Sequence, residues 1–342
     1  MARTNFKSEI SIAIVGEETL LGKDLSDVLA SRIPEAAFVG FAASGEGNFG
    51  ETEGEAVYVE PVTEAALGSA SAVLIAGTPA GAQKIYDLAK AMVQPPLIID
   101  CTGYLEHLPE ARMAAPLFRE VDVRQSWLFS MAHPAASALA LLLWRLAKYR
   151  SLRQMVVNIF EPASEYGKKG LTELHQQTTG LLAFKPLEKD VFDSQLSFNL
   201  LAQLGEEAPV RLAATEQRIE RHLAMLLDEQ QTHSNIPRPS VRLIAAPVFH
   251  GFSLSVWAEF AAPIQAQELG EALASAQIEV RSAKEEAPHN VGVAGQSGLS
   301  AGDIRLDRNN PQAAWIWVVG DNLRLMADGA IDLVSAIREV VR

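Results

Sequence analysis

The sequence contains a single cysteine, Cys101, which excludes an internal disulfide and is typical of proteins kept in a reducing compartment. Basic residues are also scarce, because 29 lysines and arginines stand against 42 acidic residues and give a net charge of −13. This balance argues against nucleic acid and anionic membrane surfaces as partners. The longest apolar run, residues 135–143, is too short to span a bilayer. The opening residues lack the apolar stretch of a secretion signal, so we expect a cytoplasmic protein.

Metal-ligand spacing is also missing from the chain. Its seven histidines include His222 and His233, which are separated by a helix-like run rather than by a turn that would bring them together. We therefore expect no metal site.

The first part of the chain alternates strand-like and helical stretches. Its length of 342 residues allows two domains. Strands are predicted by runs that are apolar on both faces, which is typical of a parallel sheet covered by helices; these are residues 10–15, 37–43, 72–76 and 97–100. We predict a Rossmann-type, doubly wound α/β domain over residues 1–132, with a surface loop over residues 45–54.

The second part mixes strands and helices differently. A helix is predicted over residues 134–149, because Pro134 occupies a first-turn position. Further strands are predicted over residues 154–160, 241–249, 253–260 and 313–319. This mixture favours an α+β domain over residues 133–322 with a mostly antiparallel sheet. A last helix, within residues 323–342, is expected to return to the first domain.

The first strand runs into a glycine loop that ends at Gly22. A strand, a glycine loop and a helix in this order are how dinucleotide-binding domains begin. However, Thr19 stands where such a loop has its middle glycine, and Glu17 and Glu18 flank the phosphate position. A carboxylate about 5 Å from a phosphate charge costs roughly 3 kcal/mol at an effective dielectric constant of about 20. We predict that the loop binds no dinucleotide tightly, unless both acids turn away. A plain turn in which Gly16 and Gly22 serve packing fits the same residues.

Several segments, taken in order, resemble motifs of the aspartate-semialdehyde dehydrogenase family. They are residues 16–22, 98–103, 132–137, 163–170, 246–253 and 320–324. The resemblance implies a homodimer and a cofactor, NADP or NAD if any binds. It would place the cofactor on Gly16, Thr19, Gly22, Ser44 and Gly77.

The family's catalytic residues are replaced at the matching positions. The family uses a cysteine nucleophile, which acts as a thiolate, and a histidine base. Here the resemblance places Ala136 and Phe252 at these positions. Glu161 matches a glutamine beside the nucleophile, Ala245 an arginine that binds the substrate carboxylate, and Glu106 an arginine that binds phosphate. No family catalytic residue is therefore retained.

Among relatives, the chain is most similar to Usg-type homologues, which have no assigned reaction. Residues 167–170, 195–199 and 246–249 carry this likeness. We therefore expect a catalytically degenerate homologue, a dimer that binds a small molecule or a protein partner, with Trp315 and Trp317 suited to the interface. Two alternatives remain open. One is an NAD(P)-dependent aldehyde or semialdehyde dehydrogenase of the aspartate-family amino-acid pathway that uses displaced residues, and the other is a protein that modifies or scaffolds another enzyme.

A few residues could supply displaced chemistry. Cys101 ends a predicted strand near the ligand-binding rim, although cysteine is often buried for packing alone. His250 lies two residues before Phe252 and would share its face on a strand. His133 could cap the following helix or line the pocket. Lys168 and Lys169 could hold an anion or simply be solvated.

Overall fold

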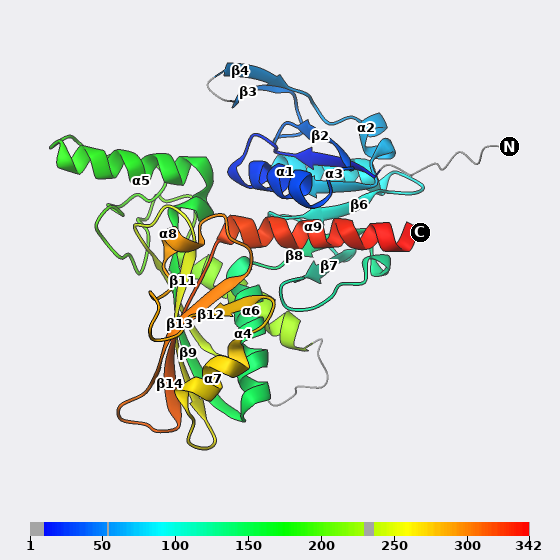
Figure 1. Ribbon diagram of the computed structural model, residues 1–342. Coiled ribbons are helices and arrows are strands. Elements are labelled where there is room, and N and C mark those ends of the chain that lie inside the picture. Colours follow the sequence, from blue (N-terminus) through cyan, green and yellow to red (C-terminus); the bar gives the residue numbers. More distant parts are fainter. Residues whose placement is uncertain (1–9, 53–54, 229–235, 342) are drawn as a thin grey trace. The chain divides into compact units, whose positions relative to one another are not determined.

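The computed structural model describes residues 10–52, 55–228 and 236–341 (Figure 1). The chain forms two compact units. The first comprises Met1–Ala132 together with Met326–Arg342, and the second comprises His133–Leu325. No helix in the described ranges is long and apolar enough to cross a membrane.

The first unit is built on a six-stranded sheet in the order β2-β1-β5-β6-β8-β7, with every neighbouring pair parallel. Its strands are β1 (Ser11–Val15), β2 (Ala37–Phe41), β5 (Ala72–Ile75), β6 (Leu97–Asp100), β7 (Ala111–Ala114) and β8 (Leu128–Met131). The predicted Rossmann-type parallel sheet is confirmed. The sequence did not reveal β7 and β8, because each has four residues and no clear apolar run.

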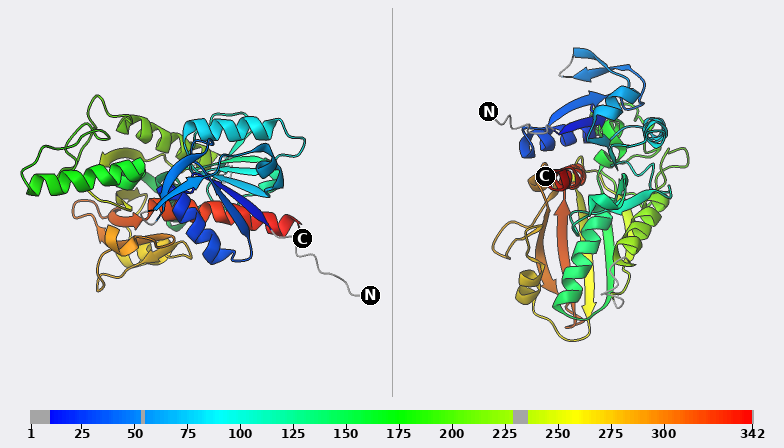
Figure 2. Two further views of the ribbon diagram at one scale, coloured as in Figure 1. Left: turned by 90° about the horizontal axis from the view of Figure 1, so that it is seen from above. Right: turned by 90° about the vertical axis from the view of Figure 1, so that its right-hand side faces the viewer.

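Helices cover both faces of this sheet, as Figures 1 and 2 show. Side chains alternate along β1, so that Ile12 and Ile14 belong to one core and Ala13 and Val15 to another. The first core includes residues of α1 and α9, and the second includes residues of α2 and α3. The helices of this unit are α1 (Leu20–Arg32), α2 (Glu64–Ser69), α3 (Pro79–Lys90), the short η1 (Val123–Gln125) and most of α9 (Asn322–Val341).

A hairpin follows β2. Strands β3 (Asn48–Thr52) and β4 (Glu55–Val59) pair antiparallel. The predicted surface loop over residues 45–54 is therefore wrong for residues 48–52, and residues 53 and 54 lie outside the described chain. Sequence patterns did not reveal β3, because residues 48–52 (Asn-Phe-Gly-Glu-Thr) contain no apolar run.

The second unit contains a mixed six-stranded sheet in the order β10-β9-β11-β14-β13-β12. The three central pairs are antiparallel and the two outer pairs are parallel, so the mostly antiparallel prediction is confirmed. The strands are β9 (Leu152–Glu161), β10 (Ser240–Ala245), β11 (Phe252–Phe260), β12 (Ile278–Val280), β13 (Leu299–Leu306) and β14 (Ala313–Gly320).

Helices α4, α6 and α7 pack together and against strands of this sheet. The helices of the unit are α4 (Pro134–Tyr149), η2 (Ala163–Tyr166), α5 (Gly167–Leu182), α6 (Leu212–Asp228), α7 (Ala266–Leu273) and α8 (Asn290–Val293). Leu254, Val256 and Ala258 of β11 are buried. Trp257, which lies between the last two and points to the opposite face, is only half-buried. The other face of the sheet is therefore not covered by these helices.

That second face, which we call the open sheet face, carries aromatic and aliphatic side chains. Trp257 pairs with Trp315 on β14 and with Val156 on β9, so the three lie side by side. Val156 and Trp315 are both exposed. Asp307 Oδ2 accepts hydrogen bonds from the indole nitrogens of Trp257 at 2.9 Å and of Trp315 at 3.1 Å. The carboxylate thereby fixes both rings.

Candidate functional site

The glycine loop between β1 and α1 is held by its own side chains. Gly16 has a φ of +92°, and its amide donates to Phe41 O at 2.7 Å. The Thr19 hydroxyl donates to Gly16 O at 2.7 Å and accepts from the amide of Gly22 at 3.0 Å. Thr19 is thus the N-cap of α1. The hydroxyl of Thr19 thereby occupies the amide of Gly22, a donor of the kind that a phosphate-binding loop offers to its ligand.

The two acids of the loop both turn toward β2. Glu18 Oε1 accepts a hydrogen bond from the amide of Ala43 at 2.8 Å. The Glu17 carboxylate lies directly against Gly40, because a Cβ built on that glycine would lie 1.4 Å from Glu17 Oε2. Ala43 O in turn accepts from the amide of Thr78 at 2.9 Å. These hydrogen bonds and contacts connect the carboxyl ends of β1, β2 and β5.

Ser44 and Gly77 also lie at this edge of the sheet. A Cβ on Gly77 would lie 2.3 Å from Ala43 O, so the close approach of two backbones requires glycine there. The structure therefore brings the predicted cofactor positions Gly16, Gly22, Ser44 and Gly77 together, and backbone packing accounts for the glycines.

Cys101 lies in the apolar core of the first unit and is 4% exposed. Burial, reinforced by the negative charge of Asp100, raises the pKa of its thiol well above the ordinary value. A thiolate is the reactive form of cysteine, so this environment suppresses nucleophilic attack. The contacts match the packing interpretation of Cys101.

The loop after β6 closes on the buried carboxylate of Asp100. Its Oδ1 accepts from the amides of Thr102 and Gly103, and its Oδ2 accepts from the amide of Leu105 at 2.8 Å. Asp100 is fully buried, so these bonds replace water and fix the path of the loop. Glu106, which the resemblance matches to the family's phosphate-binding arginine, follows Leu105 directly.

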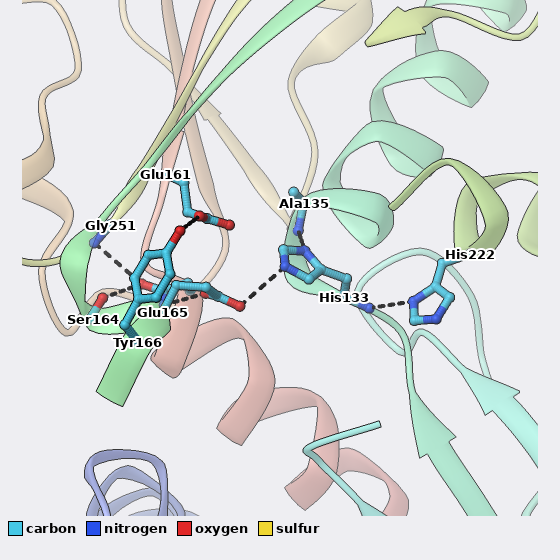
Figure 3. Close-up of polar contacts among 9 residues, drawn as sticks. His133, Ala135, Glu161, Ser164, Glu165, Tyr166, His222 and Gly251 are labelled. Carbon is cyan, nitrogen blue, oxygen red and sulfur yellow. Dashed lines mark hydrogen bonds and ion pairs between the residues drawn. The ribbon is translucent and has the colours of Figure 1, made fainter. Parts of the chain in front are cut away.

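In the second unit, His133 begins helix α4. Its Nδ1 accepts from the amide of Ala135 at 3.2 Å, which makes His133 the N-cap. Its own amide donates to Nδ1 of His222 at 3.0 Å, as Figure 3 shows. The capping alternative for His133 thus agrees with these contacts. Ala136, which the resemblance matches to the nucleophile, lies in the first turn of α4, is fully buried and carries no reactive group.

A polar network surrounds Glu165 of η2 (Figure 3). Glu165 Oε1 lies 3.1 Å from His133 Nε2, and Glu165 Oε2 accepts from the side-chain amide of Asn322 at 2.9 Å. Asn322 Oδ1 accepts from the Ser164 hydroxyl at 3.0 Å. Burial opposes ionisation of Glu165, but His133, Asn322 and Arg218 outweigh it and lower the pKa of the carboxyl. Glu165 is therefore the ionised acid of this site.

Glu161, at the end of β9, is the second acid. It is 3% exposed, and its Oε2 accepts a hydrogen bond from the Tyr166 hydroxyl at 2.6 Å. Its Oε1 is buried with no hydrogen-bond partner among the described residues. Burial, reinforced by the charge of Glu165, raises the pKa of Glu161 to about 8. Glu161 is therefore mostly protonated at neutral pH, and like a glutamine side chain it can offer both a donor and an acceptor.

Phe252, which the resemblance matches to the family's histidine base, is 3% exposed and pairs with Gly320. The predicted strand over residues 241–249 ends early, because β10 stops at Ala245. His250 lies in the turn that follows, where Gly251 has a φ of +78°, so the prediction that it shares a strand with Phe252 is wrong. Strand alternation therefore gives no reason for His250 to replace the base.

The remaining candidates are placed as follows. Ala245 is fully buried, and its amide and carbonyl both pair with Leu201. Lys168 and Lys169 are exposed in the first turn of α5. His233 lies outside the described residues. Within the described ranges, no three histidine, cysteine, aspartate or glutamate side chains are grouped to hold a metal.

Sequence reasoning missed several of the residues in this network. Glu165 and Tyr166 lie inside one motif that carried the family resemblance, residues 163–170, and Asn322 lies inside another, residues 320–324. The motifs were the signal that could have found them. Their partners could not be read from the sequence, because they are far apart along the chain.

Comparison with known proteins shows which family and fold the chain is similar to. A family model described as "Semialdehyde dehydrogenase, dimerisation domain" matches residues 143–325. A "USG-1 protein homolog" of Pseudomonas aeruginosa is 32% identical over 230 residues, which cover 66% of this chain and 67% of that protein. A solved structure of "a probable aspartate-semialdehyde dehydrogenase from Pseudomonas aeruginosa" has a TM-score of 0.81 at 26% identity and covers 98% of this chain and 100% of that one. An aspartate semialdehyde dehydrogenase "with NADP" from Candida albicans has a TM-score of 0.64 at 14% identity, covering 97% of this chain and 99% of that one.

Proposed function

Because this chain belongs to the aspartate-semialdehyde dehydrogenase family, we propose that it is a catalytically degenerate member that binds a ligand or a partner instead of oxidising an aldehyde. The observation that carries the proposal is that apolar side chains stand where the resemblance places the family's nucleophile and base. Ala136 and Phe252 are both buried, and neither can attack a carbonyl or transfer a proton. Ala245 provides no charge for a substrate carboxylate.

The cofactor loop supports the same proposal, since its residues do not fit NADP. Thr19 satisfies the loop backbone with its own hydroxyl, and Glu18 Oε2 is a buried acceptor with no partner among the described residues. A phosphate needs donors and positive charge, and here it would meet carboxylates. Hydride transfer to NADP is therefore not expected of this protein.

The proposal is tested with the purified protein, aspartate semialdehyde, phosphate and NADP. We expect no reduction of NADP, and we expect no gain from Ala136→Cys, because Phe252 still provides no base. A calorimetric titration with NADPH, repeated with NADH, should give no micromolar binding. Turnover that is lost in Cys101→Ser or His250→Ala would instead support a dehydrogenase with displaced residues. An active family member assayed in parallel verifies the reagents.

We further propose that the chain forms a homodimer through the open sheet face. The matched dimerisation domain, residues 143–325, contains all the strands that build this face. Exposed Val156 and Trp315 give it the apolar and aromatic character typical of an interface core.

Trp315→Glu is expected to convert the dimer into a monomer, because a buried carboxylate would replace an indole at the centre of the interface. Sedimentation velocity would show this as a halving of the mass. Val93→Glu is a matched control, since Val93 is 99% exposed and lies in the other unit. A wild-type monomer, or a Trp315→Glu dimer of unchanged stability, would contradict the proposal.

A further inference from the structure

A cavity lies within the second unit, where α7 packs on β12 and β13 at the edge of the mixed sheet. Its volume is about 630 Å³, which is in the range of small-molecule sites. The residues that line it come from three stretches, which are residues 266–274, 280–287 and 303–305. Ala136, Glu161 and Phe252 do not line it. The cavity is therefore separate from the positions that the resemblance matches to catalytic residues.

The floor of the cavity is apolar. Ala266, Gly270 and Ala274 are spaced by one helical turn each, so α7 and its C-cap line the cavity with small residues on one side. A Cβ built on Gly270 would lie 3.5 Å from Ile304 Cδ1 and 3.6 Å from Val280 Cγ1. The glycine thus leaves open the space that a side chain would fill, and the two branched side chains close the floor beneath it.

A β-bulge in β13 shapes the wall opposite α7. The register with β14 shifts between Gly302 and Arg305, so Asp303 and Ile304 together oppose a single residue of that strand. Asp303 has a φ of +45°, a left-handed conformation that aspartate adopts more readily than most residues do. Bulges change the direction of side chains and are common beside functional sites. Here both bulged residues line the cavity.

The first charged group at the floor is the carboxylate of Glu271, which follows Gly270 on α7 and is exposed. Its Oε1 accepts a hydrogen bond from Gln267 Nε2 at 3.0 Å. Within the described ranges it forms no ion pair. A carboxylate has acceptor sites for several donors, so Glu271 keeps the capacity to bind a cation.

The second charged group is the guanidinium of Arg281, which follows Val280. Its side chain is 23% exposed, and its Nε lies 3.7 Å from Glu279 Oε2. Its Nη1 donates to Glu286 O at 3.5 Å. Both distances are longer than that of an ordinary hydrogen bond. The planar N–H groups of Arg281 are therefore still able to bind a carboxylate.

The other charges of the lining are matched locally. Arg305 Nη2 lies 3.0 Å from Asp303 Oδ2. Glu285 Oε2 accepts from both the amide and the hydroxyl of Ser282 at 2.7 Å. A carboxylate and a guanidinium therefore remain for a ligand. They flank the same apolar floor, because each follows a residue of the approach between α7 and β12.

We propose that this cavity binds a zwitterion with a large apolar side chain, the class to which the aromatic and larger aliphatic α-amino acids belong. Glu271 binds the ammonium group, Arg281 binds the carboxylate, and the side chain rests on the floor. A ligand with a single charge would leave one of the two protein groups without a partner. The inference goes beyond the proposed function, because it assigns a ligand class to a different site.

The test is a calorimetric titration of the full-length protein with L-tryptophan, whose indole is the largest apolar side chain of the class. Three probes each lack one feature. Tryptamine has no carboxylate, indole-3-propionate has no ammonium group, and glycine has no side chain. Each should bind at least about tenfold more weakly than L-tryptophan, because it loses a charged hydrogen bond or the burial of apolar area.

Two variants assign the charged groups of the protein. Glu271→Gln should weaken binding of L-tryptophan about tenfold or more and leave the affinity for indole-3-propionate unchanged. Arg281→Gln should weaken binding of L-tryptophan to a similar extent and leave the affinity for tryptamine unchanged. Lys284→Gln is the matched control, since Lys284 is exposed in the same loop and does not line the cavity. Thermal unfolding checks that each variant is folded.

Three results would overturn the inference: no binding of L-tryptophan to the wild type, equal affinity for L-tryptophan and either singly charged probe, or unchanged binding of L-tryptophan in both variants. The probes decide the matter even where a variant does not fold. This outcome is separable from that of the proposed function. Reduction of NADP would refute the degenerate chemistry and leave the cavity untouched, whereas a failure to bind L-tryptophan would refute only the cavity.

Discussion

Glu161→Gln is expected to abolish most of the loss of stability that the wild-type protein shows as the pH rises from 5 to 9. Burial and the charge of Glu165 raise the pKa of Glu161 from 4.5 to about 8 in the folded chain. The folded state therefore holds this proton more tightly than the unfolded state does. The contribution of Glu161 is fully present below pH 4.5, declines as pH rises, and is lost above pH 8. The loss is at most about 5 kcal/mol, by the conversion of a pKa shift to free energy.

Glutamine has the shape of the protonated acid and stays neutral at every pH. Its amide oxygen can still accept the hydrogen bond from Tyr166. We therefore expect the variant to match the wild type near pH 5 and to exceed it increasingly up to pH 9. Urea unfolding at several pH values measures the free energy of unfolding of both proteins. The titration of all other groups cancels in the difference between them.

Glu165→Gln is the matched control for this experiment. The pKa of Glu165 is lowered, so its contribution to stability is present above the unfolded pKa and lost as the solution becomes acidic. The control should therefore be destabilised at neutral pH, because His133 and Asn322 lose their carboxylate partner. Parallel pH profiles for the wild type and Glu161→Gln would show that Glu161 does not hold a proton in the folded protein.

Gly22→Ala is expected to destabilise the protein by about 3 kcal/mol, the upper part of the range for overpacking. A Cβ at this position would lie 2.0 Å from Gly16 O and 2.6 Å from Glu17 Cα. Both are backbone atoms of the glycine loop, so they cannot move without shifting β1 or α1. The substitution tests whether this glycine is retained for packing, independently of any bound nucleotide.

Gly68→Ala provides the comparison, because it makes the same change on α2 with nothing within 4 Å of the new Cβ. It should stabilise the protein by about 0.5–1 kcal/mol through lower chain entropy and better helix propensity. Urea or thermal unfolding of the two variants gives opposite signs if the packing explanation is correct. Equal and small effects would show that the loop relaxes easily around a methyl group.

The sequence predicted the parallel and the mostly antiparallel sheet because the pattern of apolar residues that distinguishes them is visible within single strands. Runs such as β1 and β5 are apolar on both faces, and β11 alternates along its whole length. β3 and β8 were missed, since β3 is mostly polar and Ser130 interrupts the apolar run of β8. The turn at Gly251 was also missed, because Val248 and Phe249 continue the apolar pattern of β10 although the chain has left the sheet.

The candidate site was only partly predictable, for a different reason. The resemblance to family motifs drew attention to Ala136 and Phe252, since each lies inside a short motif, and to Glu161, which stands two residues before another. The direction of the Glu18 side chain and the contact between His133 and Glu165 depend on tertiary packing between distant segments. The shifted pKa values of Glu161 and Glu165 are consequences of the same packing. None of these properties is encoded in a short stretch of sequence.

The pair of indoles bound to Asp307 gives the open sheet face an optical property of its own. Trp257 and Trp315 donate to one carboxylate oxygen, so their emission depends on the same charge and on the water around it. Covering Trp315 with another surface would remove that water and shift the emission to shorter wavelength. Dilution of the native protein should then report the association of this face by its fluorescence alone, without any attached label.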